Sequence, residues 1–411
     1  MKNRLPLKIA YAIGQFGWSL ASFGVANLLN YFYMPPDNGE HSLFPHFIFQ
    51  GFVMGLFTIL GLISFTGRFF DGIWDTYIAQ RSDKAVSKFG RRRIFMIGGI
   101  FPFAISSLLI FYPISSNSDL NTLWLIAMTI IFYVSMTLYV VPYAALMSEL
   151  AEDPKDRLFI STLISVTWAA GSVFGNLVYS LEDYFSKSMS HVDAFQLTML
   201  LFTIIATLAM LVPILFINEE KHCKQMDDRH DYHFLVAVKK VFQNRAFKNF
   251  IISDLAYWTA VSIIQIGMVY YVHVLLKLEL KTVTEVFTGI YLLSFSLYVP
   301  IVWIANRLGK RRTQIISFWM TIVVYLLIAC LGKLPFASSF MQIAIIGIII
   351  AFPLATFGII PNAIVGDIID KNYEHTGERS TAMFYAVRSF VMKCGISIAN
   401  LIFPSLMLLG N

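Results

Sequence analysis

Three charged residues, Arg68, Asp71 and Asp75, interrupt a stretch that is otherwise apolar from about residue 48 onward. Their spacings of three and four residues place them along one stripe of a helix. If Arg81 marks a membrane interface, Asp75 lies roughly 9 Å deep and Asp71 roughly 15 Å deep at about 1.5 Å per residue. A carboxylate at that depth must face a partner or water, because facing lipid costs at least about 2.5 kcal/mol.

The stripe has two interpretations. Paired carboxylates four residues apart and directed at a cavity suit the binding of a small cation or the exchange of a proton. The alternative is structural: an Arg68–Asp71 pair joins helices, and Asp75 extends toward the interface.

A positive counterpart lies in RSTAMFYAVRSFVMKCG, residues 379–395. By the same rise per residue, Arg388 lies about 12 Å deep and Lys393 about 20 Å deep. Lys393 has no carboxylate within a turn on its own helix, so we expect its partner on another span, with Asp71 and Asp75 as candidates. Arg388 either takes part in function or extends to the interface near the helix end.

The composition indicates what surrounds these charged residues. The chain is 57% hydrophobic and 14% charged, and apolar stretches of about 20 residues recur along its length. Its basic residues lie in short loops, which is typical of a multi-pass membrane protein and not of a nucleic-acid-binding face. The cysteines lack ligand spacing, so neither a metal site, a disulfide framework nor a cofactor is predicted: Cys223, Cys330 and Cys394.

We expect an all-α membrane protein with eleven spans, at roughly 6–34, 48–80, 93–114, 121–149, 158–182, 192–217, 246–275, 283–306, 312–333, 338–369 and 380–409. Loops alternate between basic and uncharged-to-acidic, and the basic amino terminus is expected inside. The loop endings KFGRRR and NRLGKRR echo each other after the second and eighth spans. The predicted units are a six-helix bundle (1–217), a cytoplasmic loop (218–245) and a five-span bundle (246–411), as in a six-plus-six duplicated fold without its twelfth helix. Either the sequence is truncated, which we favour, or the protein is natively short. The alternative is that internal loops attract basic residues without any duplication.

One stretch resembles a known family. GRFFDGIWDTYIAQRSDKAVSKFGRRRIFMIGG, residues 67–99, is similar to the second span and following loop of the melibiose permease family, the glycoside–pentoside–hexuronide:cation symporters of the major facilitator superfamily. Residues 366–395 resemble that family's link between spans ten and eleven, and residues 8–18 and 141–157 are also similar. The resemblance implies a major facilitator fold, cation binding by Asp71, Asp75 and Thr137, and coupling by Lys393, a role in which we include Arg68.

The departures from the family pattern concern the solute. Trp74 replaces a cation-site asparagine, and Ser19 and Val140 replace two acidic residues that hold a galactoside. A galactoside bound in the family's manner is therefore not expected. The family also contains sodium-coupled lysophospholipid carriers, and the Phe-rich spans permit that solute class as well as helix packing.

Further candidates come from polar and aromatic residues on the spans. We expect Asp254 to be a solvated carboxylate at a helix end. Residues that could line a solute cavity are Ser19, Trp74, Val140, Trp168, Asn176, Tyr257, Trp258, Gln265 and Arg388. Residues expected to act as latches between the bundles, where acids meet the basic loops, are Asp367, Asp370, Glu149, Arg91 and Arg92.

The sequence favours a cation-coupled symporter for a small organic solute, a sugar or glycoside, working by alternating access. The alternatives are a lysolipid or other amphiphile symporter and a non-transporting membrane sensor. An enzyme is not supported, because no nucleophile–base pair, metal spacing or phosphate loop is found. The expected setting is a monomer in a bacterial cytoplasmic membrane, with a solute and a coupling cation, Na⁺ or H⁺, as partners and no nucleic acid.

Overall fold

The structure is a computed structural model of the whole chain and describes residues 5–36, 43–53, 57–151, 154–223, 241–333, 338–376 and 381–409. The chain divides into two compact units. The first comprises Met1–Pro35, Ser42–Asp231 and Pro404–Asn411, and the second comprises Pro36–His41 and Tyr232–Phe403. The main division along the chain, after Asp231, falls inside the stretch 218–245.

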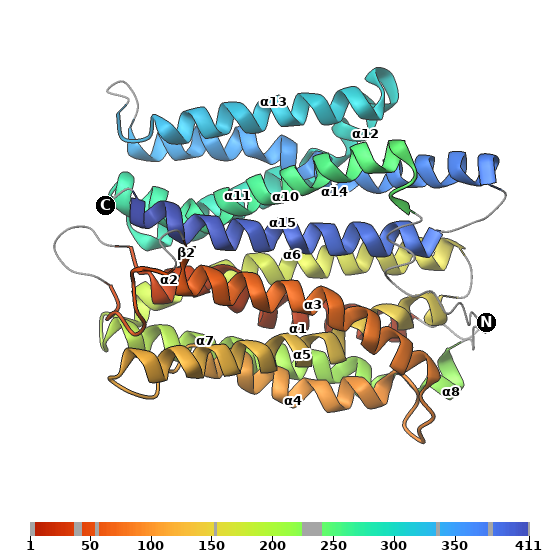
Figure 1. Cartoon of the computed structure of the whole chain (residues 1–411), viewed down its shortest axis with the longest axis horizontal. Coiled ribbons are helices and arrows are strands. Elements are labelled where there is room, and N and C mark those ends of the chain that lie inside the picture. Colours follow the sequence, from red (N-terminus) through yellow and green to blue (C-terminus); the bar gives the residue numbers. More distant parts are fainter. Residues whose placement is uncertain are drawn as a thin grey trace. The chain divides into compact units, whose positions relative to one another are not determined.

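The first unit is a helical bundle (Figure 1). Its helices are α1 (Leu5–Phe23), α2 (Leu29–Tyr33), α3 (Ile59–Lys84), α4 (Arg93–Leu109), α5 (Ser118–Leu150), α6 (Pro154–Phe185), α7 (His191–Phe216) and the short α8 (Glu219–His222). Helix α1 packs against α6 and α7, α5 packs against α3 and α4, and α4 also contacts α7. A Cβ on Gly17 would lie 2.6 Å from the Ala206 carbonyl oxygen, so this glycine permits the close approach of α1 and α7.

The second unit contains α10 (Arg245–Tyr270), α11 (Leu280–Ser296), α12 (Tyr298–Leu308), α13 (Lys310–Ala329), α14 (Ser339–Thr376) and α15 (Thr381–Leu409). Helix α14 packs against α10, α11, α12 and α13. The buried apolar core of this unit includes Phe247, Val365 and Phe384. Helix α15 approaches α10 closely at Gly395, where a Cβ would lie 3.0 Å from the Leu255 carbonyl oxygen.

In each unit one long helix continues into a π-helical segment. The segment η1 (Gly24–Leu28) joins α1 to α2, and η2 (Tyr271–Leu275) follows α10. Such π-turns are rare and occur often at functional sites. The sequence does not reveal these segments, because a π-turn leaves the apolar periodicity of a span largely intact.

The structure corrects the second expected span, 48–80. Helix α3 begins only at Ile59, where the Thr58 hydroxyl accepts a hydrogen bond from the Gly61 amide at 3.0 Å. An antiparallel pair of short strands, β1 (Phe52–Val53) and β2 (Phe57–Thr58), precedes it. The apolar run therefore includes a hairpin, and the Thr58 cap sets the start of the helix.

The eighth expected span is broken. Helices α11 and α12 are bent by 48° at a break at Leu297. Pro300 follows, and its ring and missing N–H disrupt the preceding turn. Among the described residues, seven helices are long and apolar enough to cross a membrane, or eight if the bent pair is one span. The expected count of eleven stays a prediction.

Candidate functional site

Two carboxylates and a hydroxyl meet between α3 and α5. Thr137 on α5 directs its Oγ1 to Asp71 Oδ1 at 2.8 Å and to Asp75 Oδ1 at 3.3 Å, both on α3. Asp71 is fully buried, Thr137 is 1% exposed and Asp75 is half-buried. The two carboxylate oxygens are therefore at most about 6 Å apart.

The hydroxyl of Thr137 has one proton, so it can donate fully to only one of the two carboxylates at a time. Oxygens that converge in this way suit a bound proton or a small cation, which favours hard oxygen ligands. The hydrogen bonds of Thr137 join α5 to both carboxylates of α3. Among the described residues, these two carboxylates included, no group of three or more His, Cys, Asp or Glu is placed to hold a metal ion.

Arg68 lies two turns from Asp75 on the same helix and is half-buried. Within the described part of the chain it forms no ion pair, and its buried Nε has no hydrogen-bond partner. The structural alternative of an Arg68–Asp71 pair joining helices is therefore not seen. A buried guanidinium nitrogen without a partner is unfavourable, which makes Arg68 a place where a further acceptor would be stabilised.

Trp74 follows Asp71 by three residues on α3, so the two side chains are neighbours on the helix surface. The Trp74 side chain is 39% exposed and packs edge-to-face with Tyr77 at 5.6 Å between ring centroids. It also lines an apolar groove of about 370 Å³ between α3 and α5. The other lining residues are Leu62, Ile63, Thr66, Gly67, Phe70, Ile126, Thr129, Ile130, Tyr133 and Val134. The indole is thus part of an apolar surface next to the carboxylate stripe.

The charges of α15 have different surroundings. Arg388 binds Asp254 on α10, with Nε to Oδ2 at 3.1 Å, and its Nη1 donates to the Asn362 side chain on α14. Asp254 is fully buried. The expectation of a solvated Asp254 is therefore wrong: its partner comes from a helix more than 130 residues away, which no local spacing reveals. Lys393, five residues further along α15, is half-buried in the second unit.

Two expected cavity residues of the first unit lie inside helix packing instead. Ser19 is 5% exposed and donates to the Trp168 carbonyl oxygen at 3.0 Å, where Gly171 allows α1 and α6 to approach. Asn176 is 1% exposed, and its Nδ2 donates to the Ser172 carbonyl oxygen at 2.9 Å. Small polar residues serve such close helix contacts well. The Trp168 ring is exposed, and Val140 is half-buried.

In the second unit, Tyr257 is buried and stacks on Phe357, so it belongs to the core rather than to an open cavity. Trp258 is half-buried, and its Nε1 has no hydrogen-bond partner among the described residues. Gln265 lines a space of only about 10 Å³, enough for one water molecule.

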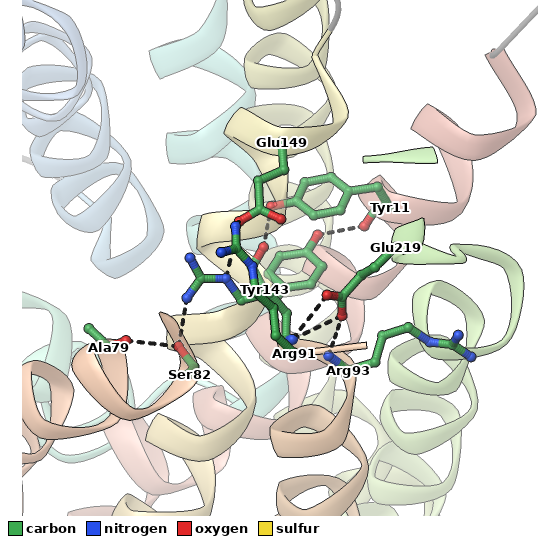
Figure 2. A network of polar contacts seen from close by, with 9 residues as sticks. Tyr11, Ala79, Ser82, Arg91, Arg93, Tyr143, Glu149 and Glu219 are labelled. Atoms are coloured by element: carbon green, nitrogen blue, oxygen red, sulfur yellow. Dashed lines mark hydrogen bonds and ion pairs between the residues drawn. The ribbon is translucent and has the colours of Figure 1, made fainter. Parts of the chain in front are cut away.

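The arginine loop, Arg91–Arg93, follows α3 and forms ion pairs and hydrogen bonds within its own unit (Figure 2). Glu149 Oε1 at the end of α5 lies 2.8 Å from Arg91 Nη2 and 3.2 Å from Arg92 Nε. Arg92 Nη1 also donates to Ser82 Oγ at 2.6 Å. These contacts lie within the first unit, so a role for the three residues as latches between bundles stays a prediction.

Sequence reasoning missed Glu219, which completes this network. Its carboxylate accepts the backbone amides of Arg92 at 3.0 Å and Arg93 at 2.5 Å, and so caps the start of α4 (Figure 2). Gly90 makes the contact possible: its φ is +100°, and a Cβ there would lie 2.6 Å from the Glu219 carboxylate. No local sequence pattern predicts this contact, because the capping residue lies more than 120 positions away along the chain.

The corresponding loop of the second unit, NRLGKRR at residues 306–312, also makes a contact with a carboxylate. Asp367 on α14 accepts a hydrogen bond from Lys310 Nζ at 2.7 Å. Both side chains are exposed, so this pair stabilises by at most about 1 kcal/mol. Asp370 is exposed and forms no ion pair within the described ranges.

Comparisons with known proteins match nearly the whole chain. The sequence model of the family described as MFS/sugar transport protein matches residues 10–409. The isoprimeverose transporter of Lactiplantibacillus pentosus is 21% identical over 406 residues, which cover 97% of this chain and 79% of the relative. An uncharacterized symporter, YnaJ of Bacillus subtilis, is 24% identical and covers 98% of this chain and 82% of the relative.

Solved structures show the same fold at low sequence identity. The nucleoside transporter NupG superposes with a TM-score of 0.65 at 12% identity, covering 99% of this chain and 90% of that one. The inward-open xylose transporter XylE of E. coli gives 0.61 at 15% identity, covering 97% and 88%. The expected major facilitator fold is therefore confirmed.

Proposed function

Because this chain belongs to the MFS/sugar transport protein family, whose members are multi-pass membrane transporters and not enzymes, we propose that it is a symporter coupling a cation to a sugar or glycoside. One observation carries the proposal. Asp71 is fully buried on α3, the helix that we assign to the second membrane span, and it shares the Thr137 hydroxyl with Asp75. Buried intramembrane carboxylates are costly, and in membrane proteins they mark ion and proton pathways.

In this proposal Asp71, Asp75 and Thr137 bind the coupling cation. Binding neutralises the carboxylates, which lowers the cost of moving them through an occluded state during alternating access. One monovalent cation moving through 100 mV supplies about 2.3 kcal/mol, enough for a more than tenfold solute gradient. Lys393 and Arg68 provide the positive charges that respond to the cation. Their assignment rests on sequence position, and for Arg68 also on its buried, unpaired Nε.

We propose protons as a driving ion, with sodium as a weaker or equal alternative. Trp74 stands where the family has an amide, and its ring lines an apolar groove, so it supplies no oxygen to a sodium shell. Two carboxylates and one hydroxyl still leave room for water to complete such a shell.

The setting we propose is a monomer in a bacterial cytoplasmic membrane with the amino terminus inside. Basic loops favour the cytoplasmic side of a membrane, and Arg91–Arg93 and Arg311–Arg312 lie in two of them. We give Glu149, Arg91, Arg92, Asp367 and Asp370 the role of cytoplasmic latches.

The groove between α3 and α5 favours a second candidate solute, an amphiphile such as a lysolipid. Its lining is apolar apart from Thr66, Thr129 and the Tyr133 hydroxyl, which suits a hydrocarbon chain better than a sugar. The volume of about 370 Å³ lies within the range of small-molecule sites.

Reconstitution into proteoliposomes tests the proposal. A panel of sugars, glycosides and lysolipids is offered with an inward proton gradient, an inward sodium gradient or neither. The proposal expects one solute class to accumulate only when an ion gradient is present. Equal uptake with and without gradients would reject coupling, and a lack of flux for every solute would favour the non-transporting alternative.

A further inference from the structure

A second buried carboxylate lies in the first unit, far along the sequence from Asp71 and Asp75. Glu182 is in the last turn of α6 and is fully buried. Its Oε2 accepts a hydrogen bond from Tyr31 Oη at 2.5 Å, and its Oε1 lies 3.1 Å from His191 Nδ1. The His191 side chain is 40% exposed, so the imidazole reaches the solution while the carboxylate does not.

The helix dipoles stabilise neither an ionised Glu182 nor a protonated His191. Glu182 lies three residues before the end of α6, where the helix dipole disfavours an anion, and His191 is the first residue of α7, where it disfavours a cation. The carboxylate that does suit the start of α7 is Asp193, which is bonded to Ser190. Glu182 and a protonated His191 therefore stabilise each other, through a charge-assisted hydrogen bond.

The third partner connects this pair to the end of the first span. Tyr31 belongs to α2, all five residues of which are buried, and α2 follows the π-helical segment Gly24–Leu28. The Tyr31 ring also packs against Tyr179 and Phe195. This short helix is held by two buried hydrogen bonds, from Tyr31 Oη to the Glu182 carboxylate and from Tyr33 Oη to the Ile110 carbonyl oxygen at 2.5 Å, and by ring packing.

We infer that Glu182 and His191 form a proton-binding site, separate from Asp71 and Asp75, that fixes the segment Leu29–Tyr33 while the proton is bound. The proton comes from the solution through the exposed imidazole. With the proton on His191, Glu182 is an anion with a cationic partner and accepts the Tyr31 hydroxyl strongly. When the proton leaves, the buried anion keeps only neutral donors, and the segment is held less tightly.

The surrounding groups do not replace this proton. On α6, Tyr179 and Asp183 flank Glu182. Helix α2 carries Tyr31 and also Tyr33, whose hydroxyl donates to the Ile110 carbonyl oxygen. Helix α7 carries His191 and also Asp193, which is bonded to Ser190. Asp183 adds negative charge, so it favours the protonated imidazole as Glu182 does. Under the proposed orientation the site lies at the outer end of the bundle, opposite the arginine loop, and senses the external pH.

Hydrogen–deuterium exchange of the full chain in lipid nanodiscs tests the inference. Peptides covering residues 29–33 are compared at about pH 6 and about pH 8.5, a range that spans histidine titration, after correction for intrinsic exchange. Protection of the wild type should fall about tenfold on going to the higher pH, because charged hydrogen bonds are roughly twice as strong as neutral ones. His191→Gln should lack this fall. His46→Gln, which changes an exposed histidine, is the matched control and should keep it.

Glu182→Gln keeps the size of the side chain and should also remove the pH dependence. Tyr31→Phe should lower protection at both pH values. A fall in His191→Gln equal to that of the wild type would overturn the inference, as would its loss in His46→Gln. The exchange measurement involves no transport, so failure of the symport proposal would leave this result standing.

Discussion

Thr137→Val removes one hydroxyl from the proposed cation site and little else. The residue is 1% exposed, and its hydroxyl is bonded to both carboxylates at 2.8 and 3.3 Å. A hydrogen bond to a charged group contributes about 1.5–3 kcal/mol. If Thr137 positions Asp71 and Asp75 for a cation or is itself a ligand, its loss should weaken the apparent cation affinity about 10- to 100-fold.

The assay is cation-dependent thermal stabilisation of the purified protein, titrated with Na⁺ and, separately, with pH. Stabilisation by a ligand grows as RT ln(1 + [L]/Kd), so a weaker site shifts the titration to higher concentration. Thr198→Val is the matched control: it is a buried threonine on α7 whose hydroxyl donates to the Ala194 carbonyl oxygen of its own helix. It should change the melting temperature without shifting the titration.

An unshifted titration in Thr137→Val would refute the assignment of this hydroxyl to the cation site. An equal shift in Thr198→Val would mean that general destabilisation, and not the site, controls the titration.

Three further changes probe other parts of the account. Trp74→Asn should strengthen sodium stimulation of uptake several-fold by adding an oxygen ligand; strict sodium dependence of the native protein at every pH, with no gain in the variant, would contradict this. Lys393→Ala should uncouple or stop solute accumulation and shift its pH optimum, and an unchanged flux and pH profile would place Lys393 outside the coupling mechanism. Gly90→Ala should lower the free energy of unfolding by about 1–3 kcal/mol, because its φ is +100° and a Cβ would meet Glu219. Gly98→Ala is the control and should not lower it, because the space around Gly98 is open. Thermal unfolding measures both variants.

Much of the fold could be predicted because membrane spans leave a strong apolar signal. The signal is weakest where irregular backbone is itself apolar. The strands Phe52–Val53 and Phe57–Thr58 were absorbed into the expected second span for this reason. The π-turns at Gly24–Leu28 and Tyr271–Leu275 were missed because one extra residue in a turn barely changes local composition.

The candidate site was predictable only where its residues share a helix. Asp71 and Asp75 lie four residues apart, so their common face follows from helix geometry. Thr137 entered through family resemblance alone. Asp254 was misjudged because Arg388, its partner, lies on a distant helix. Ser19 was expected in a cavity, but the nearby Gly171 places it in a close helix contact.

Replacement of Asp71 by Asn tests the central claim most directly. The change keeps the shape of the side chain and removes the buried charge that the cation would neutralise. Ion-driven solute accumulation in proteoliposomes should fall to the level seen without a gradient, while Asp119→Asn, which changes an exposed carboxylate at the start of α5, should accumulate solute like the wild type. Full ion-driven accumulation by Asp71→Asn would contradict the account.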